Sequence, residues 1–385
     1  SSNTVTIDAG SDKVEVTLKD VNIDTSSRNK AAVSVTGSGN TTIKLDGDNH
    51  LTGGNGIYSN SSGSLTISGD ENDSLTAQGG DSRNGIYSVS GDVTISGGTV
   101  TATGGNSTGS YGSGGDGIHS GSLTVSGGTV NANGGNSGNG TYSGGGDGIA
   151  SGSLTVSDGT VNAKGGNCGN GNYSDGGNGI SSSGSLTISG GTVDAKGGNS
   201  GNGNYSAGGN GIDNGGRSGS ITISGGTVDA KGGNSGTGDY SNGGSGICNG
   251  GRSGSITISG GTVNAAGGND GNGNYSYGGS GIHSVSGSID LSGSLELTAK
   301  AGSSNGKALS QNGKELDLDT IKDKLDPGAK VTTNANGETK EVSIPRPVEP
   351  EGPVIPEESS SSSDGGSAAP SAPASPLPGL TVTDK

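Results

Sequence analysis

This chain has nine tyrosines and no phenylalanine or tryptophan, so any binding of a ligand to an aromatic ring of these types must use tyrosine. Six of them stand seven residues before a recurring isoleucine. A column of amphipathic rings is suited to sugars, which stack on aromatic faces and hydrogen-bond to neighbouring amides and hydroxyls. The six predicted ligand-binding tyrosines are Tyr111, Tyr142, Tyr173, Tyr205, Tyr240 and Tyr275.

The tyrosines lie in glycine-rich segments such as GGNSGNGTYSGGGDGI, residues 134–149, which also repeat asparagine. Four asparagines that share one place in these segments are predicted to bind the same ligand: Asn136, Asn167, Asn199 and Asn234. Two interpretations remain open from the sequence. The tyrosine column is a glycan-binding face, or its rings stack on one another and hold the glycine-rich loops against the body.

Catalytic and metal-binding signals are sparse. His50, His119 and His283 are dispersed, with no spacing typical of a catalytic triad or a metal site. Asp116 and Asp147 precede Gly-Ile in two repeats, but later repeats have Asn or Ser there. Calcium prefers several charged oxygen ligands, so calcium is a weak alternative to the absence of a cofactor. We therefore expect a protein that is not an enzyme.

Hydroxyl and charged residues form further outward columns. The motif Leu-Thr-Ile-Ser repeats a Thr and a Ser, as in Thr187 and Ser189, and a regular hydroxyl lattice would suit ice binding. Thr is also simply favoured on exposed strands. Lys196 and Lys231 are placed to offset Asp194 and Asp229, which predicts structural charge balance.

These columns require stacked coils to position them. The isoleucine anchors recur at intervals of 29 to 35 residues, at Ile57, Ile86, Ile118, Ile149, Ile180, Ile212, Ile247 and Ile282. Between them, segments such as Leu186-Thr187-Ile188 and Thr192-Val193-Asp194-Ala195 alternate apolar and polar residues with period two. The pattern predicts an all-β, right-handed parallel β-helix with three strands per coil and Gly/Asn/Tyr-rich loop inserts.

Changes in pattern divide the chain. Residues 1–52 are expected to form an N-terminal cap with the first coils, and residues 53–297 the repetitive coils. Residues 298–344 are expected to form a C-terminal cap that includes a short helix within 316–325. Residues 345–385, rich in Pro, Ser and Glu, predict a disordered linker that leads to further modules.

Composition restricts the partners. Glycine accounts for 87 of 385 residues, and the formal net charge of -16 argues against nucleic acid and anionic membranes. No apolar run is long enough to insert into a bilayer. Cys168 and Cys248 occupy different places in the repeat, two coils apart, and are expected to be free thiols.

The run VTIDAGSDKVEVTLKDVNIDTSSRNKAAVSVTGSGNTTIKLDGDNHLTGGNGIYS, followed by units of the type GSLTISGGTV, resembles a bacterial carbohydrate-binding β-helix family related in fold to pectate lyases. The resemblance covers roughly residues 3–300. It implies a secreted or cell-surface protein that binds a polysaccharide or a cell-surface glycan, and in some members holds calcium. Adhesion through a glycan is the leading expectation, with a structural stalk or spacer and ice binding as alternatives.

Overall fold

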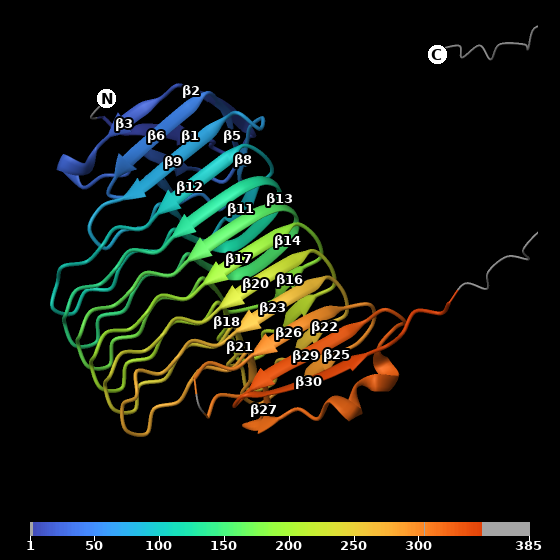
Figure 1. The fold of residues 1–385 in the computed structure, drawn as a ribbon. Coiled ribbons are helices and arrows are strands. Elements are labelled where there is room, and N and C mark those ends of the chain that lie inside the picture. The colour runs from blue at the N-terminus through green and yellow to red at the C-terminus, as the bar shows by residue number, and fades with distance from the viewer. Residues whose placement is uncertain (1–2, 304, 349–385) are drawn as a thin grey trace, which may run out of the picture. The chain divides into compact units, whose positions relative to one another are not determined.

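The computed structural model describes residues 3–303 and 305–348, which form a parallel β-helix of about eleven coils (Figure 1). The short strands of the first column are β1 Val5–Asp8, β4 Val33–Thr36, β7 Ile57–Ser59, β10 Ile86–Ser88, β15 Ile180–Ser182, β18 Ile212–Asn214, β21 Ile247–Asn249, β24 Ile282–Ser284 and β27 Leu309–Gln311. Each pairs in parallel with its equivalent in the next coil, directly or through β13 and β14.

Two further columns complete each coil. The second contains β2 Val14–Lys19, β5 Thr41–Asp46, β8 Leu65–Ser68, β11 Asp92–Ile95, β16 Leu186–Ile188, β19 Ile221–Ile223, β22 Ile256–Ile258 and β25 Ile289–Leu291. The third contains β3 Asn22–Asp24, β6 Asp48–Gly53, β9 Ser74–Gly79, β12 Thr99–Thr103, β17 Thr192–Lys196, β20 Thr227–Lys231, β23 Thr262–Ala266, β26 Glu296–Lys300 and β29 Lys330–Ala335. In two coils one strand runs through all three columns, as β13 Ile118–Asn133 and β14 Ile149–Lys164.

The core confirms the predicted inward residues. All eight isoleucine anchors are fully buried, and each pairs in register with the next, as Ile180 does with Ile212. Val193 and Ala195 are also fully buried, while Asp194 between them is only partly buried. Because identical side chains stack coil on coil, a thin core can be close-packed with few apolar residues per coil.

Glycine corners turn the chain between the second and third columns. Gly191 has a φ of 70°, a left-handed conformation that suits glycine. A Cβ built there would lie 2.5 Å from the Gly159 carbonyl oxygen of the preceding coil. The equivalent corner in other coils repeats this positive φ, as at Gly159 and Gly226.

The C-terminal end is closed by antiparallel strands and short turns. β29 pairs with β30 Glu338–Ser343, and β27 with β28 Lys314–Glu315. The helix expected within 316–325 is instead two 3₁₀ turns, η2 Leu318–Thr320 and η3 Lys322–Lys324, and a third, η1 Ser26–Arg28, lies near the N-terminus. Asp317 caps η2 by accepting from the Asp319 backbone N–H. Leu318, Ile321 and Leu325 from this segment join the core.

Residues 5–53 form the first two coils, continuous with the later ones through pairs such as β4–β7 and β5–β8. Most of the predicted linker, residues 349–385, lies outside the described residues. Within residues 3–303 and 305–348, no helix has the length and apolar character needed to cross a membrane.

Candidate binding site

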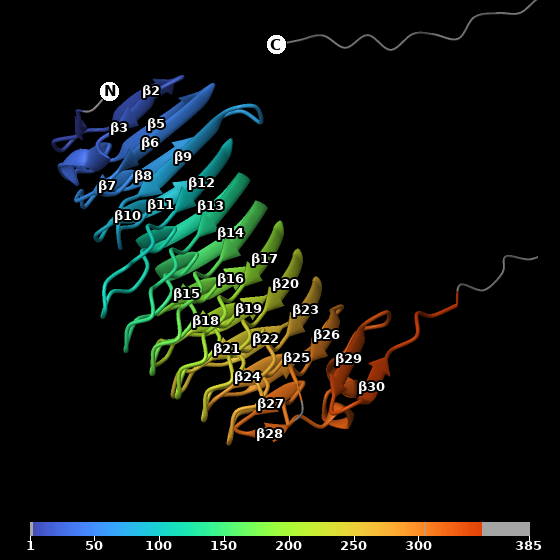
Figure 2. The ribbon, with the colours of Figure 1, turned by 60° about the vertical axis from the view of Figure 1, so that its left-hand side comes forward.

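The glycine-rich inserts form a second layer beside the coils, which we call the fin (Figure 2). It consists of residues 104–117, 134–148, 165–179, 197–211, 232–246 and 267–281. Each insert leaves the third column, turns, and returns to the first. Backbone hydrogen bonds zigzag between the two arms: Gly146 N donates to Gly135 O at 2.8 Å, and Gly166 N of the next coil donates to Gly146 O at 2.8 Å.

Close backbone approach explains why glycine is required in both arms. A Cβ built on Gly198 would lie 1.9 Å from Gly166 O, and one on Gly209 would lie 1.9 Å from Gly177 O. No real Cβ tolerates such contacts. The fin is therefore a packed layer in which backbone meets backbone, held in register by the coils below it.

The tyrosines stand on the fin as a continuous ring stack, from Tyr142 through Tyr173, Tyr205 and Tyr240 to Tyr275 (the tyrosine ladder). Ring centroids of neighbours are 4.9–5.1 Å apart and their planes differ by 3–13°. All five residues have φ between 55° and 60°, a left-handed conformation that is rare for an aromatic residue. The stacking interpretation is confirmed for these five residues.

Stacking changes what the rings can offer to a ligand. The interior rings of Tyr173, Tyr205 and Tyr240 are each 47% exposed, against 64% and 68% for the end rings of Tyr142 and Tyr275. Both faces of an interior ring are covered by its neighbours, so only its edge and hydroxyl reach solvent. Each end ring has a stacked neighbour on one side only within residues 3–303 and 305–348.

Tyr111 stands outside the tyrosine ladder, with no ring contact within the described residues and 77% of its surface exposed. Its insert is shorter, because Asn106 precedes Tyr111 by five residues whereas Asn136 precedes Tyr142 by six. Tyr111 also lacks the positive φ that the five ladder tyrosines share.

The four predicted asparagines form a hydrogen-bonded ladder along the fin. In each, the side-chain Oδ1 accepts from the backbone N–H of the equivalent residue in the next coil, at 2.8 Å, as Asn167 does from Asn199 N and Asn199 from Asn234 N. In the same way, Asn136 Oδ1 accepts from Asn167 N, and Asn234 Oδ1 accepts from Asn269 N. Their side-chain oxygens therefore satisfy the backbone, although the four residues remain exposed. A role in ligand binding stays a prediction for the asparagines and the tyrosines.

The threonine column and the Asp/Lys column both face outward, as predicted. Thr187 pairs with Thr222 and Thr222 with Thr257, but Ser189 lies beyond the end of β16. The hydroxyl lattice is thus one regular column of threonines with serines at the corner. Lys196 Nζ lies 2.6 Å from Asp194 Oδ2, and Lys231 Nζ lies 2.8 Å from Asp229 Oδ2, as charge balance predicts.

One outward column differs from the others because its chemistry changes from coil to coil. It consists of the middle residues of the short strands, which we call the variable strip. Their register is continuous: Tyr58, Tyr87, His119, Ala150, Ser181, Asp213, Cys248, His283 and Ser310. The strip was not predicted, although it is visible in the sequence as the residue that follows each isoleucine anchor, a position that His119 and His283 share.

Carboxylates gather beside the middle of the variable strip. His119 Nδ1 lies 2.8 Å from Asp116 Oδ2, and this hydrogen bond raises the pKa of His119. Burial, with the nearby Asp116, raises the pKa of Asp147 to about 7. Burial also raises the pKa of Asp213. Asp147 also takes part in a second ladder of hydrogen bonds between coils, because its Oδ1 accepts from Asn178 N at 2.6 Å.

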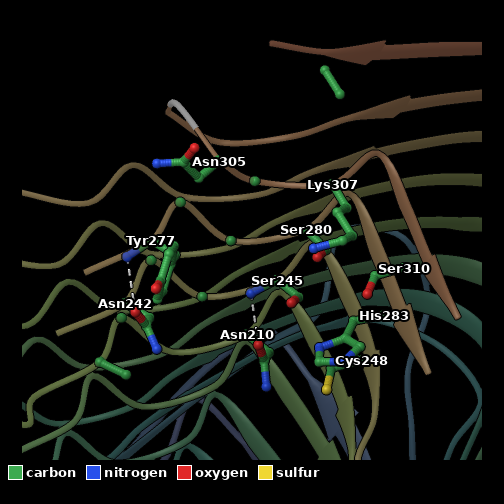
Figure 3. A pocket seen from close by; sticks show the side chains of 18 of the residues that line it. Asn210, Asn242, Ser245, Cys248, Tyr277, Ser280, His283, Asn305, Lys307 and Ser310 are labelled. Atoms are coloured by element: carbon green, nitrogen blue, oxygen red, sulfur yellow. Dashed lines mark hydrogen bonds between the residues drawn. The ribbon is translucent and has the colours of Figure 1, made fainter. Parts of the chain in front are cut away.

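A groove of about 1060 Å³ lies at the C-terminal end of the strip (Figure 3). Its walls are the returning arm of the fin, with Asn242 and Tyr277, and the cap formed by β28, β29 and β30. Its floor includes Cys248 and His283 of the variable strip. Half of the Tyr277 surface is exposed, so the groove combines an aromatic ring with amides, hydroxyls and an imidazole.

The thiols are free, as the sequence predicts, and both are buried. Burial and the neighbouring Asp213 carboxylate raise the pKa of the Cys248 thiol, which keeps it protonated and unreactive near neutral pH. Within residues 3–303 and 305–348, no three His, Cys, Asp or Glu side chains form a group that could hold a metal ion.

Comparison with known protein families, curated proteins and solved structures finds no significant match to this chain. The parallel β-helix that the resemblance implies is present, but no matching family supports its carbohydrate-binding or pectate-lyase-like part.

Proposed function

We propose that this β-solenoid is an extracellular, non-catalytic polysaccharide-binding or adhesive protein, and that the groove beside Tyr277 is its principal binding site. The observation that supports this is the lining of the groove, which places a half-exposed ring beside side-chain amides and hydroxyls. Sugar rings bind through such combinations of an apolar face and directional hydrogen bonds. The tyrosine ladder contributes mainly its free end face at Tyr275.

Affinity electrophoresis against pectin, cellulose and mucin glycans tests this proposal. We expect at least one glycan to retard the protein, and Tyr277→Ala to remove most of the retardation. Tyr275→Ala should weaken it less, and Tyr205→Phe, which keeps the stacked ring, should leave it unchanged. If no glycan retards the protein, or if Tyr277→Ala has no effect, binding in the groove is wrong.

Glycan binding along the whole tyrosine ladder is tested separately. If Tyr173→Ala combined with Tyr205→Ala removes retardation while the groove variant does not, the binding face is the tyrosine ladder itself. The double variant must first be shown to keep its fold by circular dichroism.

A structural spacer is the second candidate function, and the satisfied polar groups of the fin favour it. Asparagine oxygens, glycine amides and ring faces are used between coils, as in the hydrogen bond from Asn234 N to Asn199 Oδ1. A spacer needs such rigidity and no ligand. Absence of retardation by every glycan would favour the spacer.

A further inference from the structure

Lys307 is unusual among the lysines of this protein. It is half-buried, whereas every other lysine in the described part of the chain is exposed. Seven of those exposed lysines form ion pairs with Asp or Glu. Within residues 3–303 and 305–348, the Lys307 ammonium has neither an ion pair nor a hydrogen bond. An ammonium without such a partner can form charge-assisted hydrogen bonds to a bound anion.

The carboxylates that line the same groove already have partners. Glu315 accepts from Ala308 N and Leu309 N through its two oxygens, at 3.1 and 2.8 Å. Asp175 Oδ1 accepts from Ala207 N at 2.6 Å. Glu338 lies 3.6 Å from Lys340 Nζ. Within residues 3–303 and 305–348, none of these three carboxylates forms an ion pair with Lys307.

Other hydrogen-bond donors line the same groove as this ammonium. In Figure 3, Lys307 extends into the groove towards Ser280, and His283 and Ser310 lie lower in the view. The Lys307 charge is close enough to act on His283. Burial is the larger cause of the lowered pKa of His283, and the Lys307 charge is the smaller one. Within the described residues, the His283 ring makes no hydrogen bond, so its N–H remains available to a ligand.

We propose that this end of the groove is an anion subsite, in which Lys307, His283 and the Ser280 and Ser310 hydroxyls bind an acidic substituent of the glycan. The inference rests on the proposed polysaccharide binding and specifies its charge. An ammonium with nearby hydroxyl and imidazole donors suits a carboxylate, a sulfate or a phosphate, because all three present several acceptor oxygens with negative charge.

Three polymers with the same backbone separate charge from sugar recognition: hydroxyethyl cellulose, carboxymethyl cellulose and cellulose sulfate. We expect the unaltered protein to bind one of the anionic polymers at least about 10-fold more tightly than the neutral one, which corresponds to about 1.4 kcal/mol. Lys307→Gln should abolish this preference and leave binding of the neutral polymer unchanged. Lys307→Arg should retain most of the preference.

Lys300→Gln is the matched control, since Lys300 is exposed on β26, outside the groove lining, and its loss changes the net charge equally. If Lys300→Gln weakens anionic binding as much as Lys307→Gln, the effect is general electrostatics and the subsite is wrong. Binding of all three polymers with equal affinity would overturn only the subsite. Failure of all three and of every natural glycan would overturn the proposed function as well.

Inorganic sulfate and phosphate provide an independent readout. A ligand that binds only the folded state raises its thermal midpoint. Millimolar sulfate or phosphate should therefore raise the midpoint of the unaltered protein more than that of Lys307→Gln, at constant ionic strength. An equal rise in both proteins would contradict the subsite.

Discussion

The ring of Tyr173 lies 4.9 Å from the ring of Tyr205, and their planes differ by only 3°. Both residues adopt a left-handed backbone conformation, with φ of 55° and 57°. The rise of one coil matches the preferred separation of stacked rings, so each insert fixes the orientation of the next. The stack therefore links five consecutive inserts of a layer built mostly of glycine.

Tyr205→Ala should lower stability, since it removes two stacked pairs worth about 0.5–1.5 kcal/mol each. Tyr205→Gly should cost less than Tyr205→Ala because glycine tolerates the positive φ. Tyr205→Phe should be neutral. Thermal unfolding followed by circular dichroism measures all three. If alanine is no worse than phenylalanine, the stack does not contribute to stability.

Asn199→Ala should lower stability by about 0.5–1.5 kcal/mol because Asn234 N loses its acceptor. Asn199→Asp keeps an acceptor oxygen and should be better tolerated than alanine. Asp239 shows that a carboxylate can serve, since its Oδ1 accepts from Asn274 N at 2.8 Å in a parallel ladder. Chemical denaturation compares the variants. Equal losses for both would mean that the acceptor does not matter.

Gly198→Ala should disrupt the fin because its Cβ would lie 1.9 Å from a backbone oxygen that cannot move away easily. Overpacking of this kind costs about 1–3 kcal/mol or more. Gly138→Ala is the control, since the nearest atom to its Cβ would be Ser107 O at 3.5 Å, an ordinary contact. Hydrogen exchange of the fin amides should increase for Gly198→Ala only. Similar exchange in both variants would refute the close-packed zigzag.

Asp147→Asn should stabilise the protein at pH 8. The folded-state pKa of Asp147 is about 7, above the ordinary value of 3.8, so folding binds a proton and stability falls as pH rises from about 4 through 7. His119, whose pKa is also raised, adds a loss as pH rises through its folded value. Asparagine keeps the acceptor for Asn178 N without the charge.

Thermal midpoints at pH 5 and pH 8 test this sign. The unaltered protein should be less stable at pH 8, and Asp147→Asn should show a smaller difference between the two pH values. Asp158→Asn, at an exposed corner, is the control and should leave the difference unchanged. A stability that rises with pH in the unaltered protein would contradict the raised pKa.

Local pattern was sufficient to determine the coils. Period-two alternation places Val193 inside and Asp194 outside, whatever lies farther along the chain, and the repeated anchors set the register. The sequence could also have excluded Tyr111 from the tyrosine ladder, because the insert of Tyr111 has one residue fewer between its asparagine and its tyrosine. The cap helix was expected incorrectly, since docking of Leu318 and Ile321 onto the core favoured two short turns over one helix.

Only the tertiary structure decided which groups of the outward columns are bonded to neighbouring coils and which remain free. Ring faces and asparagine oxygens are taken up by the equivalent residues 31 to 35 positions away, and this depends on the rise per coil and on backbone conformation in the inserts. That Lys307 forms no ion pair within the described residues depends on the cap, where the two Glu315 oxygens accept from Ala308 N and Leu309 N instead. Sequence determines which residues form a column, but the distances between columns determine what remains free to bind.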